Sequence, residues 1–384
     1  MPSHSASASP SPRPAGPSTG PLPPATPPGG ALLRLSSPDE VLAAVPYLLG
    51  FHPHRSLVVM GLTGSRSRVG VTMRMDLDGM PPGQMATRVV RALQQDGDTQ
   101  AIVLVYDPEP TDPASTPDGL QPGEDVVAAV RSGLRTAGIA LKDALRISAG
   151  RWWSYLCRDE FCCPSEGSPI AAPADPGGPS LVAATAVHAG LSALPDRDAL
   201  RRSLEPPAPW VREATRQAMD RVGDALVRQC ADDQHQIVDQ ILAEVDSLIC
   251  RFEGRSPSLE PDEAARVALG LHLLQVRDAV ITWTVHDDAE ALQRLLVELV
   301  RRVGAPEHVP AATVLAWCAY LRGNGALAGV ALELVEESEP DYSLAQLLSS
   351  MLENGIHPDR LRESTEATAE EIGRPRRAGE SREP

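Results

Sequence analysis

Three of the six cysteines in this 384-residue chain lie close together, as Cys157, Cys162 and Cys163 in a C-x4-C-C-P pattern. Three thiols suggest a zinc site, because Zn²⁺ in proteins is held by sulfur and nitrogen ligands. However, the pattern lacks C-x2-C pairs, and two adjacent cysteines are poor joint ligands for a tetrahedral ion. Glu166 or a distant histidine would have to supply the fourth ligand. Zinc is therefore one interpretation among several.

The same cysteines have other interpretations. A disulfide between Cys157 and Cys162 would close a short loop in an oxidising setting. Redox or nucleophilic chemistry would instead use a free thiol. The plainest expectation is that the thiols are free and buried, packed with Trp152 and Phe161, and this is the expectation we adopt.

Arg74 and Asp76 share one face of a predicted strand, near its carboxyl end. Open α/β sheets tend to bind ligands at that end of their strands, and an unpaired buried charge is costly. The two side chains should therefore pair with each other, pair with another group, or line a pocket. Asp107 follows the next apolar run and is a similar acid at a strand end. The alternative without a functional role is that Arg74 and Asp76 form a structural ion pair or lie on a solvated edge strand. For Asp107 the corresponding alternative is a loop or cap role.

Trp152, Trp153 and Tyr155 lie in a segment, residues 151–167, that is rich in aromatic residues, although the whole chain has only 3%. Neighbouring residues of a strand point to opposite faces, so only one tryptophan of the pair can enter a given core. The other should lie on a second packing surface. The segment is either a stacking platform for a ligand or partner, or a site of packing between domains.

The histidines give weaker signals. His52 and His54 flank a proline between a helix and a strand, where a surface turn is expected. The His286-Asp287 pair is similar to the metal-binding dyad of phosphohydrolases. However, the position of Asp287 and Glu290 at the start of a predicted helix favours a helix-capping role. His235 and Asp239, one helical turn apart, should lie on a solvated face.

Composition excludes several classes of function. Lys142 is the only lysine, and neither a G-x-x-x-x-G-K-[ST] loop nor a Schiff-base site surrounds it, so P-loop nucleotide and pyridoxal phosphate chemistry are not expected. The G-x-S-x-G, G-x-G-x-x-G and H-E-x-x-H motifs are absent as well. A formal net charge of −16 argues against nucleic-acid binding. The sequence shows neither a signal peptide nor a membrane-length apolar run, so we expect a cytoplasmic protein.

The first half of the chain alternates helices and strands. Ser37 caps a helix that ends at Gly50, and further helices are expected over 85–93 and 124–137. Apolar runs predict strands at 57–62, 101–106 and 145–148, and residues 68–77 alternate as a half-buried strand should. The run at 101–106 is apolar on both faces, which is typical of a central strand. We predict a three-layer α/β domain with a mixed sheet over residues 31–205, preceded by a disordered Pro/Ser-rich tail, residues 1–30.

From Pro209 onward the spacing predicts helices alone, in an all-helical domain over residues 206–361 with a disordered tail at 362–384. The expected helices cover residues 211–230, 236–252, 262–284, 289–303, 311–322, 326–337 and 344–354. The pair joined by Gly323-Asn324-Gly325 resembles a single tetratricopeptide hairpin.

Four segments of the chain together resemble the DUF4192 proteins, an actinobacterial family of unknown function. They are LRLSSPDEVLAAVPYLLGFHPHRSLVVMGL, RMDL, RWWSYLCRDEFCCPSEG and LAWCAYLRGNGALAGVALELVEESEPDYSLAQLL. The resemblance covers roughly residues 33–355. It implies no activity and supplies no catalytic residues, because the family is named for lacking a known function.

These observations leave two functional hypotheses. The first is a binding or regulatory protein without catalysis, whose helical half contacts a protein partner and whose α/β half is a core or a small-ligand module. The second is an enzyme acting on a small metabolite at the C-terminal edge of the sheet, through Arg74, Asp76, Asp107 or Cys157. Convergence of these side chains within about 8 Å, with a perturbed acid or thiol among them, favours the enzyme, and scattering favours the binder.

Overall fold

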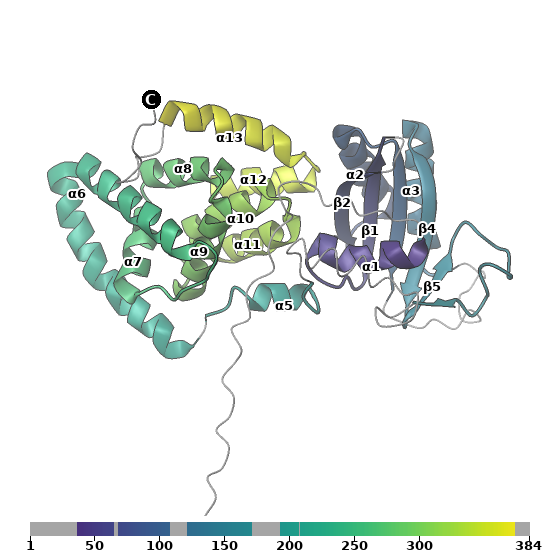
Figure 1. Cartoon of the computed structure of the whole chain (residues 1–384), viewed down its shortest axis with the longest axis horizontal. Coiled ribbons are helices and arrows are strands. Elements are labelled where there is room, and N and C mark those ends of the chain that lie inside the picture. The colour runs from purple at the N-terminus through teal and green to yellow at the C-terminus, as the bar shows by residue number, and fades with distance from the viewer. Residues whose placement is uncertain (1–36, 65–67, 108–120, 171–192, 207, 373–384) are drawn as a thin grey trace, which may run out of the picture.

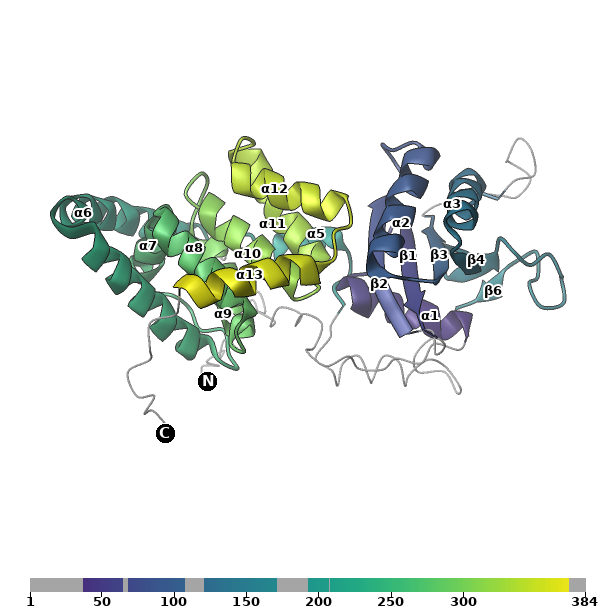
Figure 2. The same ribbon diagram turned by 90° about the horizontal axis from the view of Figure 1, so that it is seen from above.

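A computed structural model describes residues 37–64, 68–107, 121–170, 193–206 and 208–372; the predicted N-terminal tail lies outside them. The structure has a sheet-containing domain and a helical domain (Figures 1 and 2). The first domain contains α1 (Pro38–Leu49), β1 (Ser56–Thr63), β2 (Arg68–Asp76), α2 (Pro82–Asp96), β3 (Gln100–Tyr106), α3 (Glu124–Ala137), β4 (Ala140–Ser148), β5 (Arg151–Ser154) and β6 (Ser168–Pro169).

The strands form one open mixed sheet in the order β2-β1-β3-β4-β5-β6. β1 is antiparallel to both β2 and β3, and β3 is parallel to β4. The fully apolar β3 occupies a central position, as its sequence predicts. β2 is an edge strand, because among the described residues only β1 pairs with it.

The sheet is covered on both faces, which confirms the predicted layers (Figure 1). Val58 and Leu104 face α1, where they pack with Leu42 and Val45. The alternate residues Leu57 and Val103 face α2 and α3 and join the second buried cluster. Ser37 caps α1 by accepting a hydrogen bond from the Glu40 amide, and Gly50 ends the helix at φ 81°.

One strand departs from the predicted alternation. Val71, Met73 and Met75 share the face covered by α2 and α3, but Val69 packs in the cluster on the opposite face. The reason is a register shift between Met60 and Leu62, which inserts one extra residue into β2. The expectation that Val69 lies with the other apolar residues of β2 is therefore wrong.

The second domain is entirely helical within the described residues. Its elements are α5 (Arg197–Arg202), α6 (Pro209–Phe252), α7 (Pro261–Gly270), α8 (Leu274–Thr282), η2 (Trp283–Val285), α9 (Ala289–Arg302), α10 (Val309–Leu321), α11 (Gly325–Ser338), α12 (Ser343–Glu353) and α13 (Pro358–Ile372). No described helix is long and apolar enough to cross a membrane.

Several boundaries differ from the predicted ones. The expected helix over 262–284 is broken between α7 and α8, and α6 runs through the expected gap with a kink at Asp233. The tail expected to be disordered from residue 362 is helical as far as Ile372. Leu361 and Thr365 are buried in it, and Thr365 accepts a hydrogen bond from the Trp317 indole. This distant contact explains why a mostly polar segment folds.

The first helix of the tetratricopeptide-like hairpin, α10, lies in the core of the helical domain. Every residue of α10 except Trp317 is buried, with α8, α9, α11 and α13 packed around it. α5 also packs on this domain: Arg201 pairs with Glu337 of α11 at 2.7 Å. α5, which falls in the range predicted for the α/β domain, therefore contacts the helical domain.

Candidate functional site

A cavity of about 1270 Å³ lies between the two domains. One wall is the edge strand β2, all of whose residues line the cavity together with Leu49 and Phe51. The other walls are three connections of the helical domain: η2 to α9, α10 to α11, and α12 to α13. We call this cavity the interdomain cleft.

Main-chain groups of β2 face the interdomain cleft. The amide of Leu77 donates to the carbonyl of Arg55, in register with the β1–β2 ladder. Because the hydrogen-bonding direction alternates along an antiparallel strand, the main chains of Thr72, Arg74 and Asp76 point away from β1. An edge strand in this position can hydrogen-bond a bound molecule.

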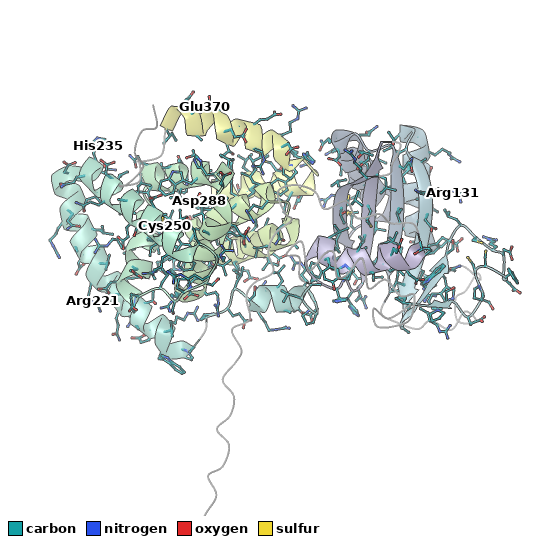
Figure 3. All side chains as sticks on the ribbon, in the orientation of Figure 1. Arg131, Arg221, His235, Cys250, Asp288 and Glu370 are labelled. Atoms are coloured by element: carbon teal, nitrogen blue, oxygen red, sulfur yellow. The ribbon has the colours of Figure 1, made fainter. Side chains whose placement is uncertain are left out.

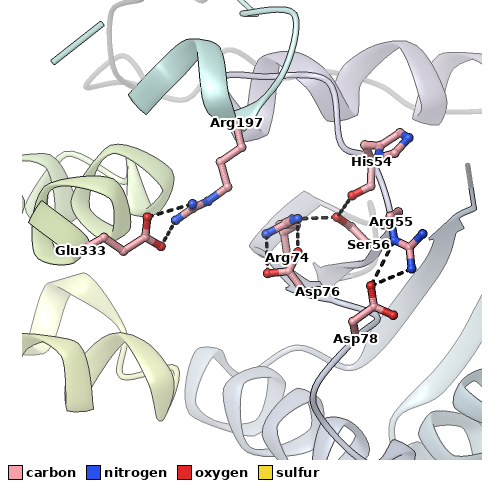
Figure 4. Close-up of polar contacts among 8 residues, drawn as sticks. All are labelled: His54, Arg55, Ser56, Arg74, Asp76, Asp78, Arg197 and Glu333. Atoms are coloured by element: carbon pink, nitrogen blue, oxygen red, sulfur yellow. Dashed lines mark hydrogen bonds and ion pairs between the residues drawn. The ribbon is translucent and has the colours of Figure 1, made fainter. Parts of the chain in front are cut away.

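Arg74 and Asp76 lie in this wall and pair with each other, as one of the sequence-based alternatives predicts. The guanidinium donates to both oxygens of Asp76, at 2.5 and 3.1 Å, and its Nε donates to the Ser56 hydroxyl at 2.7 Å. The guanidinium also lies 5.9 Å from the centre of the Phe51 ring. Figure 4 shows this pair with Arg197 of α5, which also lines the cleft and is paired with Glu333.

The turn between α10 and α11 forms the facing wall. Gly323 adopts φ 76°, and the Asn324 side chain caps α11 by accepting from the Leu327 amide. Arg322, just before it, has a side chain only 12% exposed and lies 3.8 Å from Glu290. Within the described part of the chain, neither the buried Nε of Arg322 nor the buried hydroxyl of Thr72, in the opposite wall, has a hydrogen-bond partner.

Unpaired buried polar atoms are costly, so their presence on both walls is informative. The Arg322 Nε can only donate a hydrogen bond, whereas the Thr72 hydroxyl can donate or accept one. Both residues line the interdomain cleft.

A cluster of acids and a histidine joins the domains at one end of the cleft. His357, between α12 and α13, lies 2.9 Å from the carboxylate of Asp96 at the end of α2. The other Asp96 oxygen accepts the Val71 amide, which the extra residue in β2 leaves unpaired by β1. His357 also lies 3.3 Å from Asp359. The hydrogen bond from His357 lowers the pKa of Asp96 and raises that of His357.

Asp98 is the buried member of this cluster and is only 4% exposed. Burial first, and then the charge of Asp96, raises its pKa to about 7. Both oxygens of the Asp98 carboxyl are buried and have no hydrogen-bond partner among the described residues, so burial is the main cause of its raised pKa. The Asp98 carboxyl lies so close to Gly61 and Gly70 that a Cβ on either glycine would overlap it.

The structure places Asp107 apart from Arg74 and Asp76. Asp107 pairs at 3.2 Å with Arg146 of β4, whose side chain is only 5% exposed. Arg146 is cross-strand to Val105 and Trp153, on the face of α2 and α3, whereas Arg74 is cross-strand to Val58 on the opposite face. Neither Asp107 nor Cys157 lines the interdomain cleft. The four candidate residues therefore do not share one pocket.

The tryptophan pair divides between two faces, as the alternation of a strand requires. Trp152 packs against the larger apolar cluster. Trp153 lies on the other face, where the Arg146 guanidinium is 4.9 Å from its ring centre. Tyr155 donates to the carbonyl of Pro122, and burial raises the pKa of its hydroxyl. All three have a packing role in the structure.

The three clustered cysteines are not buried, so the adopted expectation for them is wrong. Cys162 is exposed and Phe161, which was expected to cover the thiols, is 99% exposed. The segment after β5 turns sharply at Asp159 and leaves the aromatic core. The three sulfurs nevertheless converge, all within 4.8 Å of one another.

The histidine predictions have mixed outcomes. His52, His54, His235 and Asp239 are exposed, as expected. The capping interpretation of Asp287 is wrong, because Asp288 is the N-cap residue of α9 and no side-chain capping bond is present. His286 and Asp287 line the interdomain cleft instead.

Sequence reasoning missed Arg322, His357 and the Asp96–Asp98 pair. Two local signals were present: an arginine directly before a Gly-Asn-Gly turn, and an Asp-Gly-Asp segment after a helix. Neither signal shows that residues from distant parts of the sequence meet, so the pairing is visible only in the folded chain.

The fold and its cleft define a class: a two-domain protein with a mixed α/β sheet, a helical domain and a ligand-sized cavity between them. The chain belongs to the family described as Domain of unknown function (DUF4192), whose sequence model matches residues 38–359. This match confirms the resemblance seen in the sequence. No curated protein and no solved structure matches the chain.

Proposed function

We propose that this protein is a binding protein whose interdomain cleft takes a small molecule carrying a carboxylate or phosphate group. The observation that carries the proposal is the buried Nε of Arg322, which has no hydrogen-bond partner among the described residues and belongs to a residue of one cleft wall, while Thr72 of the opposite wall has a buried hydroxyl without such a partner. Oxyanions are the natural partners of a guanidinium, because several of their oxygens can accept its hydrogen bonds.

The charges around the cleft support an anionic ligand. Most of the acids that line it are already paired with cations of the protein: Asp76 with Arg74, Asp96 and Asp359 with His357, and Glu353 with Arg88. Arg68, at the start of β2, also lines the cleft and has no ion-pair partner among the described residues. The N-terminus of α11 lies in the same wall as Arg322 and adds a partial positive charge.

The position of the cleft suggests what binding would do. β2 belongs to one domain and Arg322 to the other, so a molecule that contacts both would hold the domains together. Ligand binding is then coupled to the relative position of the two domains. Regulatory proteins use coupling of this kind to change their interaction with a partner protein when a ligand binds. A catalytic role at the sheet edge has less support, because Asp107 and Cys157 lie outside this cleft.

The experiment is a thermal-shift screen of phosphorylated and carboxylated metabolites, followed by calorimetric titration of the best compound. Arg322→Gln should weaken its binding at least tenfold, because a hydrogen bond to a charged group contributes about 1.5–3 kcal/mol. Thr72→Val, nearly the same shape without the hydroxyl, should weaken it less.

The matched control is Arg216→Gln, which removes an exposed guanidinium of α6 that pairs only with neighbours on its own helix. It should bind the compound as the wild type does. Equal binding by wild type, Arg322→Gln and Thr72→Val would contradict the proposal, and so would a screen in which no such compound binds.

A further inference from the structure

The three cysteines between β5 and β6 lie far from the interdomain cleft, at the free edge of the sheet (Figure 1). The Sγ atoms of Cys157 and Cys162 are 3.0 Å apart, and those of Cys162 and Cys163 are 3.8 Å apart. Sulfurs bound to one tetrahedral Zn²⁺ at about 2.3 Å are about 3.8 Å from each other. The Cys162–Cys163 pair already has this separation, the Cys157–Cys162 pair would widen by less than one ångström, and the Cys157–Cys163 pair lies within 4.8 Å.

We infer that Cys157, Cys162 and Cys163 form a binding site for a thiophilic metal ion, Zn²⁺ in the first instance. The sequence-based objection was that adjacent cysteines chelate a tetrahedral ion poorly. The turn at Asp159 removes it, because the Asp159 carbonyl accepts the amides of both Cys162 and Cys163. This turn brings the adjacent thiols to the same side as Cys157.

The loop that carries the thiols is anchored at both ends. At the start, the Ser154 hydroxyl accepts the amides of Leu156 and Cys157 at 3.1 and 3.0 Å. At the end, the Trp153 indole donates to the Ser165 carbonyl at 3.0 Å, and Arg151 donates to the Gly167 carbonyl at 2.7 Å. A pre-positioned set of ligands loses less entropy on binding than a flexible one.

Gly167 completes this anchor. It has φ 78° and packs directly against the Trp153 indole, so that a Cβ would overlap the ring. The backbone of the loop can therefore lie on the tryptophan only because this position is a glycine.

Zn²⁺ binds cysteines as thiolates, so metal binding at this site is expected to release the thiol protons to solvent.

The site has three protein ligands and one open position. Among the described residues no fourth cysteine, histidine or acid joins the cluster. Because Cys162 is exposed, the fourth position faces solvent and takes water or a group from another molecule. A disulfide between Cys157 and Cys162 would leave Cys163 unpaired, whereas a metal ion uses all three converging sulfurs.

The test uses the full chain, reduced and stripped of metal under anaerobic conditions. Titration with Zn²⁺ against a chromophoric chelator should give one tight site per chain, and Co²⁺ should give sulfur-to-cobalt charge-transfer absorption. Cys157→Ser and Cys163→Ser should each lower the Zn²⁺ affinity at least tenfold. The control is Cys250→Ser: this exposed cysteine lies on α6 in the other domain (Figure 3), and its loss should leave the affinity unchanged.

The inference is overturned if the reduced wild-type protein takes up no Zn²⁺ beyond what the Cys157→Ser/Cys162→Ser/Cys163→Ser variant takes up. It is equally overturned if Co²⁺ gives no charge-transfer absorption with the wild type, a result that does not depend on any variant folding. Loss of the site in Cys250→Ser would also overturn it.

Discussion

Two polar clusters of the α/β domain differ in how completely their buried charges are paired. In the centre of the sheet, Arg146 pairs with Asp107 and stacks on Trp153. At the sheet edge, beside the interdomain cleft, Asp98 has another acid as its neighbour and keeps a proton near neutral pH. The first cluster combines an ion pair with a ring contact and stabilises the sheet. In the second cluster the acids have His357, a residue of the helical domain, as their cationic partner. The ionisation of this cluster therefore depends on how the helical domain is positioned against the α/β domain.

The largest expected effect concerns the central cluster. Arg146→Met should destabilise the protein by about 3–5 kcal/mol, because it leaves the carboxylate of Asp107 in a partly buried site without its cation. Adding Asp107→Leu should restore much of that loss, since a well-packed apolar pair can replace a buried ion pair. Denaturant unfolding of both variants measures this. A double variant no more stable than Arg146→Met would show that the pair has a role beyond mutual neutralisation.

A smaller effect is expected where the edge cluster meets the sheet. In Gly61→Ala the new Cβ would overlap an oxygen of the Asp98 carboxyl, so either the carboxyl or the strand must move. Overpacking of this kind costs about 1–3 kcal/mol. Gly61→Ala should cost less in an Asp98→Ala background, which a double-mutant cycle by thermal unfolding measures. If the free-energy changes of the two substitutions were additive, there would be no steric conflict between residue 61 and the Asp98 side chain.

The third effect is a pH dependence expected of the edge cluster. The folded protein keeps the Asp98 proton up to about pH 7, whereas the unfolded chain loses it near pH 3.8, so the free energy of unfolding falls as the pH rises between these values. The raised pKa of His357 acts in the same direction: its contribution is complete below about pH 6.5 and is lost as the pH rises through the raised pKa. Asp96, with a lowered pKa, acts only in acid, below its usual 3.8.

Unfolding measured from pH 5 to 8 should therefore show a decline in stability that Asp98→Asn flattens. Asp359 faces the same histidine and supports its charge throughout this range. An unchanged slope in Asp98→Asn would assign the decline to other groups.

Elements set by local chemistry were predictable from the sequence. The helix over Glu124–Ala137 was predicted to the residue, because glycines flank it and its apolar spacing is regular. Features that depend on contacts between residues far apart in the sequence were not predictable. The polar α13 is stabilised through Trp317, and the side chain of Val69 changes face because of an extra residue in the strand. The cysteines were misjudged because a turn, not a strand, follows Ser154.

The candidate site was predictable only in part. Arg74 and Asp76 were correctly placed together on one strand face. That the interdomain cleft covers them could not be inferred, because its other wall comes from residues far along the chain, and no local pattern determines how two domains meet. The unpaired atoms of Thr72 and Arg322 are likewise a property of the assembled fold.

The most direct measurement is a crystal structure of the protein with the compound that stabilises it most. Our account places an oxygen of its carboxylate or phosphate within hydrogen-bond distance, about 3 Å, of the Arg322 Nε, with the molecule lying between this side chain and β2. A structure in which the compound binds elsewhere, while Arg322 closes directly onto β2, would contradict it.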